Sequence, residues 1–119
     1  MARGHWSGWG LVAVLACAPS DAGKSEAARD VVERFFTALP SRDCAVVGPL
    51  LAIPGSCPAM VEDLNAHGLS LVEVLEVKVD GREPDAVLVR TRVARDGQVR
   101  EQPMLLRVER HPDGWKLRW

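Results

Sequence analysis

Three cysteines are the residues of this chain whose chemistry depends most on where they lie. Cys17 follows a short apolar run, residues 11–16, behind a sparsely basic start that contains Arg3. A polar stretch begins directly after it. This layout is typical of a cleaved export signal, and the apolar run is far shorter than the roughly 20 residues that a spanning helix needs. We therefore expect residues 1–16 to be a leader that is removed.

The residues Val14-Leu15-Ala16-Cys17 resemble the lipobox of bacterial lipoproteins, in which small or aliphatic residues precede the cysteine that is lipidated. The resemblance implies that Cys17 carries palmitate-type acyl chains and that the protein reaches the membrane through this lipid anchor. Two or more chains hold stably, because each buried methylene contributes about 0.8 kcal/mol. Ala18 stands where some bacteria place an aspartate for inner-membrane retention, which favours the outer membrane of the cell envelope. The alternative is an ordinary signal peptide.

The other two cysteines, Cys44 and Cys57, are expected to form a disulfide bond if the protein is exported into an oxidising compartment. Such a bond would join two short helices and restrict the unfolded chain by roughly 3 kcal/mol. The sequence contains no Cys-x-x-Cys redox pair and no Cys and His set with zinc spacing. No metal or other cofactor is expected. The alternative is two free, buried thiols.

A chain of 119 residues with a net charge of −1 suits one small domain. The last third of the chain is rich in arginine, which would suit an anionic partner or simply the solvated face of a sheet. Nucleic acid is not expected as a partner, because the arginines lack interleaved aromatic residues and the protein would lie outside the cytoplasm.

Three helices are expected before the middle of the chain, after a flexible tether of residues 17–24 that is rich in small and polar residues. Apolar residues then recur at helical spacing from an N-cap at Ser25. The helices are residues 25–39, a short irregular helix through Leu51 capped by Ser41 or Asp43, and a third from Pro58 to about Gly68.

From residue 69 onward the apolar period changes from about 3.6 to 2, which predicts β-strands. The strands are residues 71–79, 86–95, 99–110 with an interruption at Pro103, and 115–119. Asp96-Gly97 is a strong hairpin signal. The predicted fold of residues 25–119 is α+β, with the N-terminal helices packed on the concave face of a curved four-stranded antiparallel sheet.

This pattern resembles the cone-shaped superfamily of nuclear transport factor two and ketosteroid isomerase, most closely in small bacterial lipoproteins. The resemblance is carried by Phe35-Phe36 in a capped amphipathic helix and by the final strand Asp113-Gly114-Trp115-Lys116-Leu117. It implies a pocket between helices and sheet, which some members use for catalysis or ligands. It also implies a homodimer through the open sheet face as one form of assembly.

The isomerase type of this superfamily uses a tyrosine to hold an enolate oxygen, and this chain has no tyrosine. A dehydratase-like site would need an inward acid and base, for which His67 and Glu73 are the candidates. The pocket would be lined by Phe35, Trp115 and Trp119. We expect instead that His67 only complements a helix end and that Glu73 lies at a wet rim, so the chain is predicted not to be an enzyme.

Trp115 and Trp119 lie on one face of the last strand, where they would form either an aromatic wall for a small apolar ligand or the closure of the core. The expected function is therefore that of a lipoprotein tethered to the membrane, whose cone domain serves binding or assembly. The alternatives are a pocket enzyme of the isomerase or dehydratase kind and a carrier of apolar ligands with the same fold.

Overall fold

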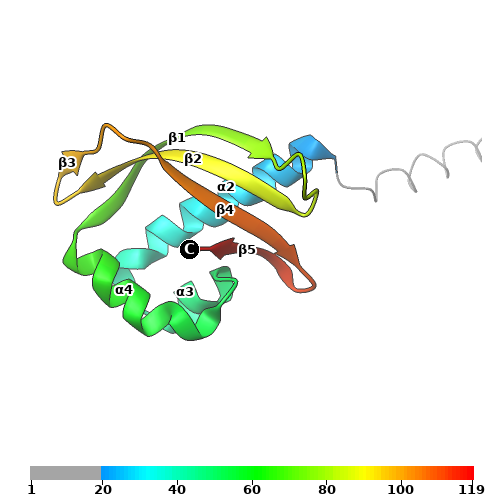
Figure 1. Ribbon diagram of the computed structural model, residues 1–119. Coiled ribbons are helices and arrows are strands. Elements are labelled where there is room, and N and C mark those ends of the chain that lie inside the picture. Colours follow the sequence, from blue (N-terminus) through cyan, green and yellow to red (C-terminus); the bar gives the residue numbers. More distant parts are fainter. Residues whose placement is uncertain (1–19) are drawn as a thin grey trace, which may run out of the picture.

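The structure is a computed structural model that describes residues 20–119. The predicted leader, residues 1–16, and Cys17 lie outside the described residues. Within residues 20–119, no helix combines the length and the hydropathy that a membrane crossing needs. Helices come first along the chain and strands follow, as Figure 1 shows.

The first described helix, α2 (Asp21–Ala38), begins earlier than predicted. Its N-cap is Ser20, whose hydroxyl accepts a hydrogen bond from the backbone N–H of Gly23 at 3.1 Å, so the predicted cap at Ser25 is wrong. The last four residues of the predicted tether, 17–24, are accordingly helical. The physical reason is that a serine cap followed by an acid in the first turn satisfies the exposed N–H groups of a helix start.

Helix α2 is amphipathic, which fixes how it packs. Its polar face carries exposed i, i+4 ion pairs, Arg29 with Glu33 and Arg34 with Asp30, each at 3.6 Å. Its apolar face packs against the sheet and stabilises the fold by removing apolar surface from water. The buried residues of this face are Ala28, Val31, Val32, Phe35 and Phe36.

Short helical segments connect α2 to the sheet. They are η2 (Leu39–Ser41), α3 (Cys44–Val47), η3 (Gly48–Leu50), η4 (Pro54–Ser56) and α4 (Cys57–Ala66). Asp43 caps α3, because its Oδ1 accepts from the backbone N–H of Ala45 at 2.9 Å. Cys44 and Cys57 form a disulfide with their Cα atoms 5.9 Å apart, which confirms the predicted bond and fastens α3 to the start of α4.

The sheet is antiparallel, in the order β1-β2-β4-β5, with the short β3 pairing only with the end of β2. Its strands are β1 (Leu69–Val79), β2 (Ala86–Arg95), β3 (Gln98–Val99), β4 (Met104–His111) and β5 (Gly114–Arg118). The predicted third strand is therefore split into β3 and β4 around Pro103. In Figure 1 the strands arch over α2, which lies along their inner face. The predicted α+β architecture is confirmed.

Strand β1 departs from the predicted alternation because its pairing with β2 shifts register twice, between Leu71 and Glu73 and again between Val74 and Glu76. Each shift inserts one extra residue and reverses the side on which the following residues point. Glu73 is therefore exposed and lies opposite Arg92. Its predicted inward position is wrong.

The core lies between α2 and the inner face of the sheet. Alternate residues of β2, β4 and β5 point inward and meet the apolar face of α2, whereas the residues between them face outward. The buried apolar residues of this inner face are Val87, Val89, Val93, Leu106, Val108 and Leu117. The outward face of β4 and β5 carries the exposed Leu105 and a polar group, Arg107, Glu109, His111 and Arg118, which is the centre of the candidate site.

Candidate functional site

The residues predicted to line an inner pocket do not come together around one cavity. Phe35 is fully buried in the core, and the ring of Trp119 packs against it at 5.4 Å between centroids. Trp115 is half-buried against the same core. These aromatic side chains close the inside of the cone, although Trp119 keeps 44% of its surface exposed.

His67 is exposed at the end of α4, where its Nδ1 lies 2.9 Å from the backbone carbonyl of Asp63. It therefore complements a helix end, as expected. Glu73 faces outward from the sheet. The two candidates for an inward acid and base therefore share no cavity, and they do not form the dehydratase-like site that was the alternative.

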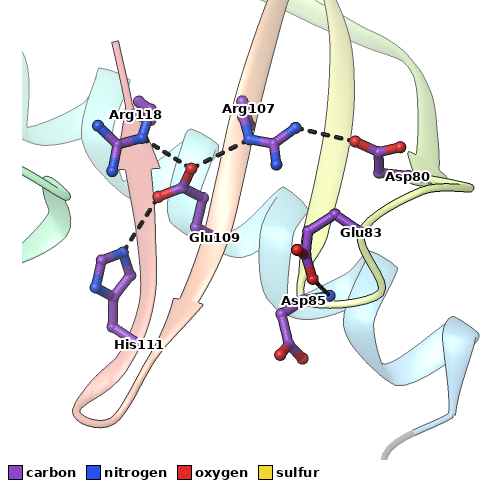
Figure 2. A network of polar contacts seen from close by, with 7 residues as sticks. All are labelled: Asp80, Glu83, Asp85, Arg107, Glu109, His111 and Arg118. Carbon is purple, nitrogen blue, oxygen red and sulfur yellow. Dashed lines mark hydrogen bonds and ion pairs between the residues drawn. The ribbon is translucent and has the colours of Figure 1, made fainter.

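A different acid and imidazole meet at an open hollow of about 270 Å³ on the outer side of the sheet, where the β1–β2 connection meets β4. We call it the Glu109 hollow. Its lining residues are Glu83, Asp85, Ala86, Arg107, Glu109, Arg110 and His111. Figure 2 shows the polar side chains of the lining except Arg110, together with the neighbouring Asp80 and Arg118.

Glu109 is the centre of this group. Its Oε2 accepts from Arg118 Nε at 2.8 Å and from Arg107 Nε at 3.1 Å, and its Oε1 lies 3.3 Å from His111 Nε2. Strand pairing fixes this arrangement, because Arg107 pairs with Arg118 across β4 and β5 and residues two apart on β4 share a face. Figure 2 shows the three side chains converging on the carboxylate.

The hydrogen bond from Arg118 does most to hold the pKa of Glu109 at about 2, against an ordinary value of 4.5. Those from Arg107 and His111 lower the pKa further, whereas burial opposes them. Glu109 is therefore ionised at neutral pH and only accepts hydrogen bonds. It follows that His111 Nε2 carries the hydrogen, and that Nδ1 of a neutral imidazole keeps its lone pair. Such a nitrogen can take a proton from a bound molecule.

The guanidinium groups around the hollow are already paired. Arg107 Nη1 donates to Asp80 Oδ2 at 3.0 Å as well as contacting Glu109, and Arg110 Nη2 pairs with Asp85. The pKa of Asp80 is lowered chiefly by the backbone N–H of Arg82 and then by the hydrogen bond from Arg107. Because each cation has an acid, the hollow is an ordered ion-pair network rather than a basic patch.

The sequence contained one signal for this site, the two-residue spacing of polar side chains near the end of the predicted third strand, and we did not use it. Arg107 and Glu109 lie two residues apart on the predicted strand of residues 99–110, and His111 continues this spacing just beyond its predicted end, so the three share one face of β4. We interpreted such charges as a solvated sheet face. That Arg118 also reaches Glu109 follows only from the register of β4 and β5.

The rest of the described chain offers no comparable site. A larger hollow of about 440 Å³ lies over α2 and α3, but its lining is mostly apolar and contains no histidine. Among residues 20–119, no group of three His, Cys, Asp or Glu side chains is placed to hold a metal ion. The Glu109 hollow is therefore the candidate with an acid and a base in contact.

Comparisons with known proteins bear on the fold. No family model matches the chain, and no curated protein matches it either. Among solved structures, a proposed aromatic ring hydroxylase from Novosphingobium aromaticivorans is 13% identical, with a TM-score of 0.60 over 83% of this chain and 87% of that one. A proposed polyketide cyclase from Sinorhizobium meliloti is 20% identical, with a TM-score of 0.50 over 75% and 92%.

A proposed dehydratase of the NTF2-like family, from Streptomyces avermitilis, is 19% identical with a TM-score of 0.48 over 78% of this chain and 89% of that one. The hydroxylase and the cyclase bear the names of enzymes, which contradicts our prediction that the chain is not an enzyme. That prediction relied on the missing tyrosine and on His67 and Glu73, and it overlooked the contact between Glu109 and His111. The chain shares the overall fold of the hydroxylase and cyclase structures, in agreement with the predicted cone-like α+β architecture.

Proposed function

We propose that this chain is a lipid-anchored protein of the bacterial cell envelope whose cone domain binds a small molecule in the Glu109 hollow. The binding is carried by one observation, the carboxylate and imidazole in contact at 3.3 Å in the wall of that hollow. The anchor is supported by the lipobox-like residues before Cys17. The disulfide between Cys44 and Cys57 supports an oxidising compartment.

The anchor is tested by replacing its sulfur. Wild-type protein, expressed in a bacterium that processes lipoproteins and fed a labelled fatty acid, should enter the membrane fraction and carry the label. The Cys17→Ser variant should lose the label and leave the membrane. A matched control, Ala18→Ser, changes the neighbouring residue and should behave as wild type. A Cys17→Ser variant that stays labelled in the membrane would contradict the anchor.

Proton transfer is the second candidate function, and the geometry of His111 favours it. Ionised Glu109 accepts from Nε2–H and so orients the ring, leaving Nδ1 as the base; this is how a carboxylate prepares a catalytic histidine. The names of the hydroxylase and the cyclase suggest aromatic and polyketide-type compounds as the first molecules to try. At such low identity they guide the choice of a panel only.

Binding is tested by following the backbone amide resonances of the purified protein while the panel is added. Compounds that bind should shift resonances of the residues around the hollow, above all Asp85 and His111. The His111→Gln variant should bind more weakly, whereas His67→Gln, which changes an exposed histidine outside the hollow, should bind as wild type. Shifts confined to the larger hollow over α2 and α3 would refute the site.

Catalysis is tested on any compound that binds and has an acidic C–H bond. Wild-type protein should accelerate the exchange of this hydrogen for deuterium. The rate with His111→Gln should be at least tenfold lower than with wild type, since general bases contribute about 10²–10⁴-fold. Equal exchange with both proteins would leave the hollow as a binding site and exclude His111 as the base.

A further inference from the structure

The start of α2 is tied to the wall of the Glu109 hollow. Lys24, in the first turn of α2, donates from Nζ to the backbone carbonyl of Pro84 at 2.9 Å. Pro84 lies between Glu83 and Asp85, which both line the hollow. In Figure 1 the start of α2 lies at the same end of the sheet as the β1–β2 connection and the β4–β5 turn. The hollow and the beginning of the described chain therefore share one end of the domain.

Only a short length of chain separates this end from Cys17. Cys17 precedes Asp21, the first residue of α2, by four positions, which span about 14 Å at most when fully extended. Helix α2 itself is about 27 Å long at 1.5 Å per residue. The β2–β3 turn lies at the opposite end of the sheet in Figure 1. The connection is shorter than α2, so it cannot span the length of the domain. If Cys17 is in the bilayer, the start of α2 must lie near the bilayer and the β2–β3 turn must lie away from it.

We infer that, on the anchored protein, the Glu109 hollow lies against the bilayer that holds Cys17 and takes the polar headgroup of a lipid from it. This inference rests on the proposed function for the anchor. The ligand of the hollow would then be the headgroup of a membrane lipid, and the lipid would stay in its leaflet while it is bound.

The charges at this end indicate that the short connection, rather than electrostatic attraction, sets the orientation. Arg107 and Arg110 are each paired with acids, and Lys24 bonds to a carbonyl. Glu83 makes no ion pair among residues 20–119. Lys24 and Arg82 have no acid partner among residues 20–119, but Glu83 beside them offsets part of their charge. The orientation should therefore persist on zwitterionic vesicles and should not weaken in salt, which screens exposed charges.

The orientation is tested with a photoreactive benzophenone amino acid at exposed positions of the lipidated, full-length protein in phosphatidylcholine vesicles. Position Arg82, in the β1–β2 connection, reports on the end with the hollow; position Gln98, in β3, is the matched control at the other end. Lipid adducts, counted by mass spectrometry, should be several-fold more abundant at 82 than at 98. The ratio should hold when salt rises from about 50 to 500 mM.

Equal adducts at both positions, or more at 98, would overturn the orientation. The same spectra show whether Cys17 carries acyl chains. A missing acyl mass would mean that the proposed anchor is wrong. An acylated protein with equal adducts at both positions would mean that only the orientation is wrong. The headgroup is tested separately with short-chain lipids that carry choline, ethanolamine or glycerol headgroups, below their micelle concentrations. At least one should shift the resonances of Asp85 and His111, and no shift with any of them would refute lipid as the ligand.

Discussion

Replacing Glu109 by glutamine removes the charge at the centre of the hollow while keeping the shape of the side chain. The carboxylate accepts from Arg118 at 2.8 Å and from Arg107 at 3.1 Å, and its side chain is only 19% exposed. In Glu109→Gln these guanidinium groups lose an anionic partner. We expect the variant to fold and to be less stable than wild type at neutral pH.

The size of the effect follows from the pKa of Glu109, about 2 in the folded protein against an ordinary 4.5. At 1.36 kcal/mol per pKa unit, the ionised form contributes about 3 kcal/mol. This is an upper bound, because water screens the part-exposed arginines. A lowered folded pKa stabilises the protein fully above pH 4.5, and the contribution is lost as pH falls toward 2, with roughly two-fifths remaining at pH 3.

Urea denaturation of wild type and Glu109→Gln, from pH 7 down to pH 3 with the disulfide intact, measures this contribution. The difference in unfolding free energy should be largest at pH 7 and should shrink steadily below pH 4.5. Glu76→Gln is the matched control, because Glu76 is exposed on the same sheet face and should change stability little at any pH. A difference that stays constant across this range would refute the assignment of the charge to Glu109.

Two further changes test the fold that positions the hollow. Gly68→Ala should lower stability by about 2 kcal/mol or more in thermal unfolding, because Gly68 has φ +58° and a Cβ there would lie 2.6 Å from Asp96 Oδ1. Gly81→Ala is the control, because Gly81 has open space around it, and it should leave the melting temperature unchanged. Replacing both Cys44 and Cys57 by alanine should cost about 3 kcal/mol, since the bond closes a loop across 13 positions. A melting temperature equal to that of wild type would show that the bond does not restrict the unfolded chain.

The strands were predictable because their signals are local. Trp115-Lys116-Leu117 alternates as β5 does, and Asp96-Gly97 forms the predicted tight turn with φ of 52° and 80° at its two residues. The disulfide could also be anticipated, since only two cysteines remained once Cys17 was assigned to lipid. For the strands a few neighbouring residues contain the information, and for the disulfide the number of cysteines does.

The errors concern features that depend on distant partners. Glu73 faces outward because β1 slips twice against β2, and nothing within β1 marks where a bulge falls. The start of α2 was misplaced by five residues because Ser20 and Ser25 are both plausible caps, and only packing against the rest of the domain decides between them. The contact of Glu109 with Arg118 needs the register of two strands, although the shared face of Glu109 and His111 could have been read from their spacing.

The most direct test of the proposed function is the intact mass of the protein extracted from membranes in detergent. A lipid-anchored envelope protein should give a chain that begins at Cys17, carries the mass of its acyl chains, and is lighter by two hydrogens for the bond between Cys44 and Cys57. An unmodified chain that begins at Met1 and contains free thiols would contradict the anchor, the compartment and the orientation of the hollow together.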